Sequence, residues 1–224
     1  MTRSVCSAAI LSILLLFSVS AYAHSGELLS FQGLGDLQQV GGFYDGPGPG
    51  AAHNIGVTFT PNFFGLRSVF NGGSGEFSST PTGTPAIFIE GTTGMQATGV
   101  MNVNPGFSRG LNFYYTAGFT GTQMETVTVW SGTNGTGSVL ATITLANNNT
   151  SCTSPTYCTW SSDGVNFSGT AHSVTFTGPG NELGLADITL GSNTTAVPEP
   201  SSIYLLGSGL AGISLFRIRR FLGV

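Results

Sequence analysis

The body of the chain alternates apolar residues with small or polar residues over many short stretches. In Thr126–Trp130, valines at every second position are separated by threonines, and Leu140–Leu145 and Ser173–Thr177 repeat this pattern. A period of two places successive side chains on opposite faces of a strand, one toward a core and one toward solvent. The pattern predicts these strands: Leu28–Phe31, Ile55–Thr60, Leu66–Phe70, Ala86–Ile89, Gly99–Val103, Leu111–Thr116, Thr126–Trp130, Leu140–Leu145, Ser173–Thr177 and Glu182–Leu190.

Turn-forming clusters separate these strands, among them Asn71-Gly72-Gly73, Asn134-Gly135 and Gly178-Pro179-Gly180. No stretch of the body has ten residues of helical periodicity. Many short strands joined by such turns are typical of two packed antiparallel sheets. We therefore expect residues 24–196 to form one all-β domain, an antiparallel β-sandwich of the jelly-roll type.

The N-terminus has the pattern of a secretory signal peptide. Arg3 supplies a positive charge, Ile10–Val19 is almost wholly apolar, and Ala21-Tyr22-Ala23 offers the small residues that signal peptidase accepts. A retained membrane anchor is the alternative, but the apolar run is short for a span of about 20 residues. We expect residues 1–23 to form an apolar helix that signal peptidase removes after Ala23.

The C-terminus is also patterned. Val197-Pro198-Glu199-Pro200 precedes Ser201–Phe216, which carries no charge and, as a helix of 16 residues, rises about 24 Å. Because basic residues beside a membrane span stay cytoplasmic, the cluster Arg217, Arg219 and Arg220 predicts a stop-transfer signal. The sequence thus predicts a single transmembrane helix over about 201–216, with the body on the outer side of the membrane.

The order Pro-Glu-Pro, short apolar helix and arginine cluster in residues 197–224 resembles the PEP-CTERM sorting signal. The resemblance implies that an exosortase, a membrane-embedded processing enzyme, recognises Pro198, Glu199 and Pro200. It also implies an inner-membrane precursor that faces the periplasm and is later delivered to the cell surface or the extracellular space. A simple tail-anchored membrane protein is the alternative.

Charge excludes one class of function. The body contains no lysine and two arginines, Arg67 and Arg109, against nine acids, so its net charge is about −7, compared with −4 for the whole chain. Proteins that bind nucleic acid neutralise phosphates with Lys and Arg. We therefore expect no nucleic-acid partner.

The cysteines predict one disulfide. Cys6 lies in the expected signal peptide, which leaves Cys152 and Cys158 as an even pair in an oxidising compartment. A metal site would need two further ligands at suitable spacing, and neither a nearby His nor a C-x-x-C motif is present. We expect a Cys152–Cys158 bond.

The body carries a second resemblance. Phe31-Gln32-Gly33-Leu34 and Asp187-Ile188-Thr189-Leu190 resemble an ectodomain that recurs in PEP-CTERM proteins and is similar to jelly-roll carbohydrate-binding modules. In such modules an acid of the first strand and an Asp of the last often share a structural Ca²⁺, which implies Glu27 and Asp187 here. The chain departs from that pattern at Gln32, where Glu is usual, and at Ala186, where a second Asp is common. We expect no other cofactor.

Catalytic groups are not evident. Glu90 and Glu125 are possible partners for glycoside hydrolysis, which needs two carboxylates across a cleft, but nine surface acids offer many such pairs. Neither His53 nor His172 accompanies a G-x-S-x-G elbow. We expect a protein that is not an enzyme.

Aromatic residues are the better functional signal. In Phe113-Tyr114-Tyr115, alternation directs at least one ring away from the core, where it could stack on a sugar ring. The other candidates are Phe43, Tyr44, Trp130, Tyr157 and Trp160. The sequence therefore favours a noncatalytic envelope or matrix protein in an extracellular polysaccharide context, with a carbohydrate-binding module as the alternative and a secreted glycoside hydrolase as a third reading.

Overall fold

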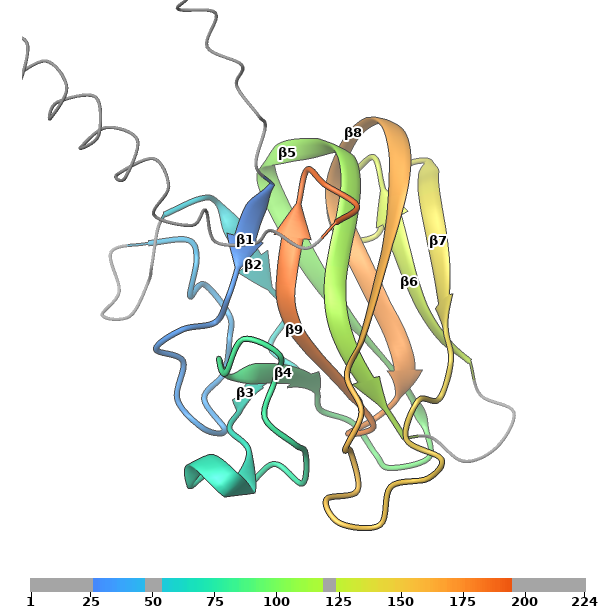
Figure 1. Cartoon of the computed structure of the whole chain (residues 1–224). Helices are drawn as coiled ribbons and strands as arrows, with labels where there is room; N and C mark the ends of the chain where they lie inside the picture. Colours follow the sequence, from blue (N-terminus) through green and yellow to red (C-terminus); the bar gives the residue numbers. More distant parts are fainter. Residues whose placement is uncertain (1–25, 47–53, 119–123, 195–224) are drawn as a thin grey trace, which may run out of the picture.

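The computed structural model describes residues 26–46, 54–118 and 124–194 (Figure 1). These residues form nine strands and one short 3-10 helix, Val69–Asn71, and contain no α-helix. The strands are β1 (Glu27–Leu29), β2 (Val57–Phe59), β3 (Phe63–Leu66), β4 (Ala86–Ile89), β5 (Gln96–Ala117), β6 (Glu125–Trp130), β7 (Val139–Leu145), β8 (Ser161–Pro179) and β9 (Leu183–Leu190). The all-β prediction is confirmed.

All strand pairs are antiparallel, and the two long strands run through both layers of the fold. The first half of β5 and the second half of β8 join β2, β6 and β7 in what we call the first sheet. Beyond an irregularity between Asn102 and Phe107, the other halves of β5 and β8 join β9, β4, β3 and β1 in the second sheet. Figure 1 shows β6 and β7 on one side of the β5–β8 pair and β9, β4 and β3 on the other.

The two sheets pack face to face through large aromatic side chains. Phe176 of the first sheet makes edge contacts with Phe63 and Phe113 of the second, at ring-centroid distances of 6.0 and 6.1 Å. All three rings are fully buried. Such interdigitation of inward side chains defines a β-sandwich, so that prediction is confirmed.

The alternation in the sequence corresponds to the observed faces. On β6, Val127 and Val129 are fully buried, whereas Thr126 and Thr128 lie on the outer face of the first sheet. On the end of β5, Phe113 and Tyr115 point into the core and Tyr114 lies half-buried on the outer face of the second sheet. One aromatic ring of this run does point away from the core, as the pattern predicted.

Two details of the predicted strands are wrong. Leu66–Phe70 is not a strand, because β3 ends at Leu66 and the chain turns into the 3-10 helix, capped by the Ser68 hydroxyl and ended by Gly72 at φ 72°. The stretches 99–103 and 111–116 are parts of one strand, since the intervening residues bulge without leaving the ladder.

The predicted signal helix (1–23) and transmembrane helix (about 201–216) lie outside the described residues. Within residues 26–46, 54–118 and 124–194, no helix is long and apolar enough to cross a membrane.

Candidate functional site

A cleft of about 450 Å³ opens on the second sheet near the start of β9. Its floor follows one row across three strands, because Gly184 of β9 is in register with Phe88 of β4 on one side and Thr116 of β5 on the other. Phe88 faces outward here because Ile87 and Ile89 point into the core. Gly184 is required for close packing, since a Cβ there would lie 2.8 Å from Cγ2 of Thr116.

One wall of the cleft is a pair of loop segments joined side by side. Phe77 and Tyr157 form a parallel bridge, in which the Tyr157 N–H donates to the Glu76 carbonyl (3.0 Å) and the Ser78 N–H donates to the Tyr157 carbonyl (2.9 Å). Trp160 supports this wall, because its ring meets Phe77 edge-on at 5.6 Å and its Nε1 donates to the Ser78 carbonyl (3.2 Å). The wall therefore holds two aromatic rings, Phe77 and Tyr157, over an aromatic floor.

The predicted disulfide is present and closes the loop that carries Tyr157. Cys152 and Cys158 are bonded, with Cα atoms 5.7 Å apart. The Ser78 hydroxyl donates to the Cys158 carbonyl (3.1 Å), and the buried Asn149 accepts from the Thr159 N–H (2.8 Å). The disulfide loop is thus fixed to both the cleft wall and the body.

The rim of the cleft is acidic. Glu76 and Glu182 line it together with Ser74, Asn181 and the exposed Leu37. No basic side chain belongs to the lining. Within the part of the chain that the structure describes, neither rim carboxylate accepts a hydrogen bond or forms an ion pair.

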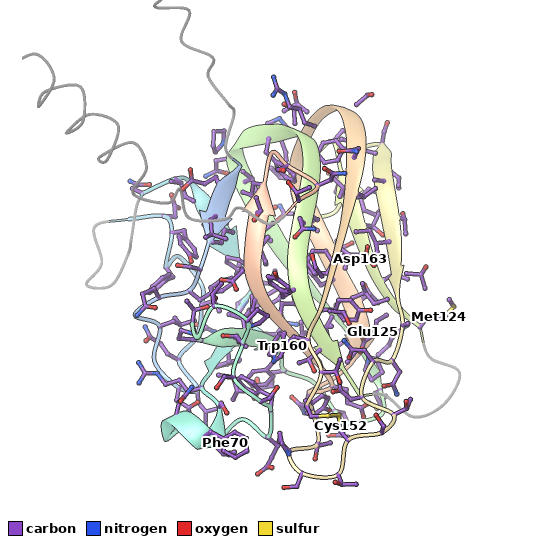
Figure 2. The ribbon with its side chains drawn as sticks, in the orientation of Figure 1. Phe70, Met124, Glu125, Cys152, Trp160 and Asp163 are labelled. Atoms are coloured by element: carbon purple, nitrogen blue, oxygen red, sulfur yellow. A yellow bond between two sulfur atoms is a disulfide. The ribbon has the colours of Figure 1, made fainter. Side chains whose placement is uncertain are left out.

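A third carboxyl group lies buried close to the cleft, at the first residue of β6. Glu125 is fully buried, and its two carboxyl oxygens have no hydrogen-bond partner in the structure. Burial, and then the charge of Glu182, raises the pKa of Glu125 to about 8. Burial, followed by the charges of Glu182 and Glu125, raises the pKa of Tyr157 to about 12. Figure 2 shows Glu125, Trp160 and Cys152 toward the same end of the sandwich, at the bottom of the view.

The pair of acids that hydrolysis would have used is not assembled. Glu125 is buried in the sandwich, whereas Glu90 is exposed directly after β4. The backbone N–H of Glu90 donates to the Asn62 carbonyl (2.8 Å), which holds it beside β3. The absence of enzymatic activity stays a prediction.

The calcium candidates lie near one end of β9. Glu27 is exposed on β1 and pairs with Leu190, while Asp187 is buried and accepts hydrogen bonds from the hydroxyls of Thr82 (2.6 Å) and Thr84 (3.3 Å). Burial raises the pKa of Asp187 against the opposing effect of these hydroxyls. Among the described residues, no three His, Cys, Asp or Glu side chains are grouped to hold a metal ion. The hydroxyls of Thr82 and Thr84 already donate to the Asp187 carboxylate, so a calcium ion would have to compete with them. Calcium binding by Glu27 and Asp187 stays a prediction.

The predicted aromatic candidates divide among the cleft, the core and the outer face of the first sheet. Tyr157 and Trp160 build the cleft wall. Tyr44 is instead buried in the core, where its hydroxyl accepts from the Phe31 N–H (2.7 Å). Trp130 is half-buried on the outer face of the first sheet, where its Nε1 donates to the Thr175 hydroxyl (3.0 Å). Sequence reasoning missed Phe77, Phe88 and Gly184, which become neighbours only through strand pairing.

The described part of the chain is thus a β-sandwich domain with an aromatic, acid-rimmed cleft. Residues 196–220 match the PEP-CTERM protein-sorting motif, so the predicted C-terminal signal is confirmed. This motif implies an exported protein that is targeted to the cell envelope and processed by an exosortase. The residues predicted for that signal, Pro198 to Pro200 and Arg217 to Arg220, and the cleavage residues Ala21 and Ala23 lie outside the described ranges.

Three solved structures share parts of the fold at low identity. The K3 and K1 cleaved adhesin domains of Lys-gingipain from Porphyromonas gingivalis W83 are 17% and 14% identical, cover 54% and 75% of this chain and 81% and 100% of their own, and give TM-scores of 0.36 and 0.40. A carbohydrate-binding module from Cellvibrio mixtus lichenase 5A, solved with cellotriose, is 14% identical, covers 59% of this chain and 88% of its own, and gives a TM-score of 0.32. No curated protein matches the chain.

Proposed function

We propose that this chain is a noncatalytic protein of the cell envelope or extracellular matrix, exported as a jelly-roll-like sandwich and sorted by its C-terminal tail in an exopolysaccharide context. The position of the PEP-CTERM motif carries the proposal. The last strand, β9, ends at Leu190, and the motif begins at residue 196, so the tail follows the folded domain almost at once. The proposed parts are a signal peptide (1–23), an ectodomain (24–196) and a sorting tail (197–224).

The tail acts through simple physical rules. Pro198 and Pro200 cannot donate ladder hydrogen bonds, so the recognition peptide stays apart from the sandwich. Residues 201–216 satisfy their backbone polar groups as a helix in the bilayer. Arg217, Arg219 and Arg220 stop translocation, so the precursor faces the periplasm with Pro-Glu-Pro within reach of a membrane enzyme.

Replacement of Pro198, Glu199 and Pro200 by alanine tests this assignment. We expect normal export and signal-peptide removal, but accumulation of the full-length protein in the inner membrane. Mass spectrometry of both termini, in envelope and culture fractions, distinguishes the forms. Cleavage and release of the alanine variant at the wild-type rate would instead support an ordinary tail anchor.

A saccharide-binding role of the ectodomain is the second candidate, favoured by the cleft. Phe88 and Tyr157 present half-buried aromatic rings backed by the buried Phe77, and Ser74 and Asn181 offer hydrogen-bonding groups at the rim. A volume of about 450 Å³ falls within the range of about 300–1,000 Å³ that is usual for ligand sites. Aromatic rings stack on the apolar C–H faces of sugars, and the polar rim would orient the hydroxyls.

Loss of the Tyr157 ring tests this role. In a gel that contains polysaccharide, migration of the full-length protein should be retarded. Tyr157→Ala should lose this retardation, and Tyr157→Phe should keep it. Half-buried Tyr114, on the outer face of the same sheet but not among the residues of the cleft, provides the control Tyr114→Ala. Equal retardation of the wild type and Tyr157→Ala would remove the cleft from the saccharide role.

A further inference from the structure

The charged side chains that line the cleft are both acidic. Glu76 and Glu182 stand at the rim without a protein partner in the described residues, and Glu125 lies buried beside them. Burial, and after it the negative charge of Glu182, raises the pKa of both Glu125 and Tyr157. Both rim carboxylates face solvent in the free protein, because Glu76 is exposed and Glu182 is half-buried. A ligand that covers them must replace their water with hydrogen-bond donors, and a cation supplies the strongest donor.

The apolar surface of the cleft narrows the choice of cation. A small inorganic ion would leave the half-buried rings of Phe88 and Tyr157 without a ligand contact. Aromatic faces attract an ammonium group and stack on apolar C–H groups, so one ligand that carries both would use the rings and the carboxylates together. Ser74 and Asn181 at the rim suit hydroxyl groups on the same ligand.

We propose that the cleft binds a polysaccharide of amino sugars whose amino groups are free and protonated. Sugar rings lie against Phe88 and Tyr157, and Glu76 and Glu182 accept hydrogen bonds from the ammonium groups. The inference rests on the proposed saccharide role and names its ligand class. Neutral polysaccharides would offer the carboxylates hydroxyl donors but no positive charge, and acidic polysaccharides would be repelled.

The full-length protein is titrated with three tetrasaccharides of the same β-1,4 linkage: glucosamine, N-acetylglucosamine and glucose. We expect the glucosamine tetramer to bind most tightly, and added salt to weaken its binding because rim charges are screened. Glu76→Gln and Glu182→Gln should each weaken it by about tenfold, the size of one hydrogen bond to a charged group. Glu90→Gln, an exposed acid next to β4, is the matched control and should bind like the wild type.

The outcomes separate the two proposals. If the neutral tetramers bind as tightly as glucosamine and both Gln variants keep that affinity, the amino-sugar inference fails and the saccharide role stands. If none of the three tetramers binds, both fail. A tetralysine peptide that binds as tightly as the glucosamine tetramer would show that the cleft recognises charge rather than sugar, which also overturns the inference. Thermal unfolding of each variant confirms that its fold is intact.

Discussion

The two outer faces of the sandwich are built by the same alternation but differ in kind. On the first sheet, threonines stand in register across four strands: Thr98 beside Thr177, Thr177 beside Thr126, and Thr126 beside Thr144. A second row holds Thr175, Thr128 and Thr142, and the Thr98 and Thr177 hydroxyls are 2.9 Å apart. On the second sheet, the corresponding outward row is Phe88, Gly184 and Thr116, enclosed by loops.

This difference separates what strands do from what loops do. The threonine face needs only strand register, because each threonine is the outward neighbour of a buried residue such as Val127 or Phe176. The cleft also needs the 74–78 segment and the disulfide loop, which come from distant parts of the sequence and meet at the Phe77–Tyr157 bridge. The cleft therefore depends on contacts between loops that are far apart in the sequence, in addition to the strand register beneath it.

The largest expected effect on stability comes from Glu125. This residue begins β6 of the first sheet, and the charge of Glu182 at the cleft rim contributes to its raised pKa. Glu182, Tyr157 and Tyr115 are the titratable groups that face it from the neighbouring elements. Because the fold raises the pKa of Glu125 from 4.5 to about 8, the unfolded chain loses this proton first as pH rises. The free energy of unfolding should therefore fall between those two pH values, and level off above them.

Glu125→Gln should remove this fall and stabilise the protein by a few kcal/mol near pH 8, at about 1.4 kcal/mol per pKa unit, with little effect below pH 4. Urea unfolding across the pH range measures it, and Glu90→Gln serves as the exposed control. A parallel pH dependence in the wild type and Glu125→Gln would contradict the assignment.

The disulfide should divide the two faces. The double substitution Cys152→Ser and Cys158→Ser removes a cross-link that stabilises the fold by about 2 kcal/mol. Without it, the loop that carries the cleft wall should become more mobile. Hydrogen exchange should then accelerate at the amides of Tyr157 and Ser78, while Val127 and Val129 stay protected. Equal acceleration on both sheets would show that the loop supports the whole sandwich rather than the cleft.

The smallest effect is expected on the threonine face. Thr177→Val removes the hydroxyl contact with Thr98 but keeps the branched shape that suits a strand, so the cost should be about 0.5 kcal/mol or less. The matched change Thr170→Val, at an exposed position near the β8 irregularity, controls for the loss of a hydroxyl alone. A loss of tetrasaccharide binding in Thr177→Val would break the distinction between the faces.

Particular residues show how far the sequence leads. Thr126–Trp130 was predicted as a strand because valine and threonine alternate without interruption. The first half of β8, residues 161–172, was missed because Asp163, Gly164 and Gly169 interrupt any apolar period, and pairing with β5 alone makes it a strand. The burial of Glu125 could have been predicted, because Glu125 lies in phase with the buried Val127 and Val129.

The cleft could be predicted only in part. The disulfide followed from counting cysteines, and Tyr157 and Trp160 were recognised as candidate rings. Their partners were not, because Phe77 reaches Tyr157 through an isolated bridge between loops, and Gly184 is placed by the long-range pairing of β9 with β5 and β4. Asp187 adopts φ 51° within β9, a local irregularity that its own sequence does not announce.

The place of β9 in the fold sets an order of events during export. β9 lies between β5 and β4, with β1 beside it, so the second sheet stays open along its middle until the last strand has arrived. That strand ends at Leu190, and five residues separate it from residue 196, where the sorting motif starts. In a chain that leaves the cytoplasm N-terminus first, the domain therefore closes only shortly before the sorting motif reaches the membrane. An incompletely translocated copy has neither a complete sandwich nor an accessible sorting motif.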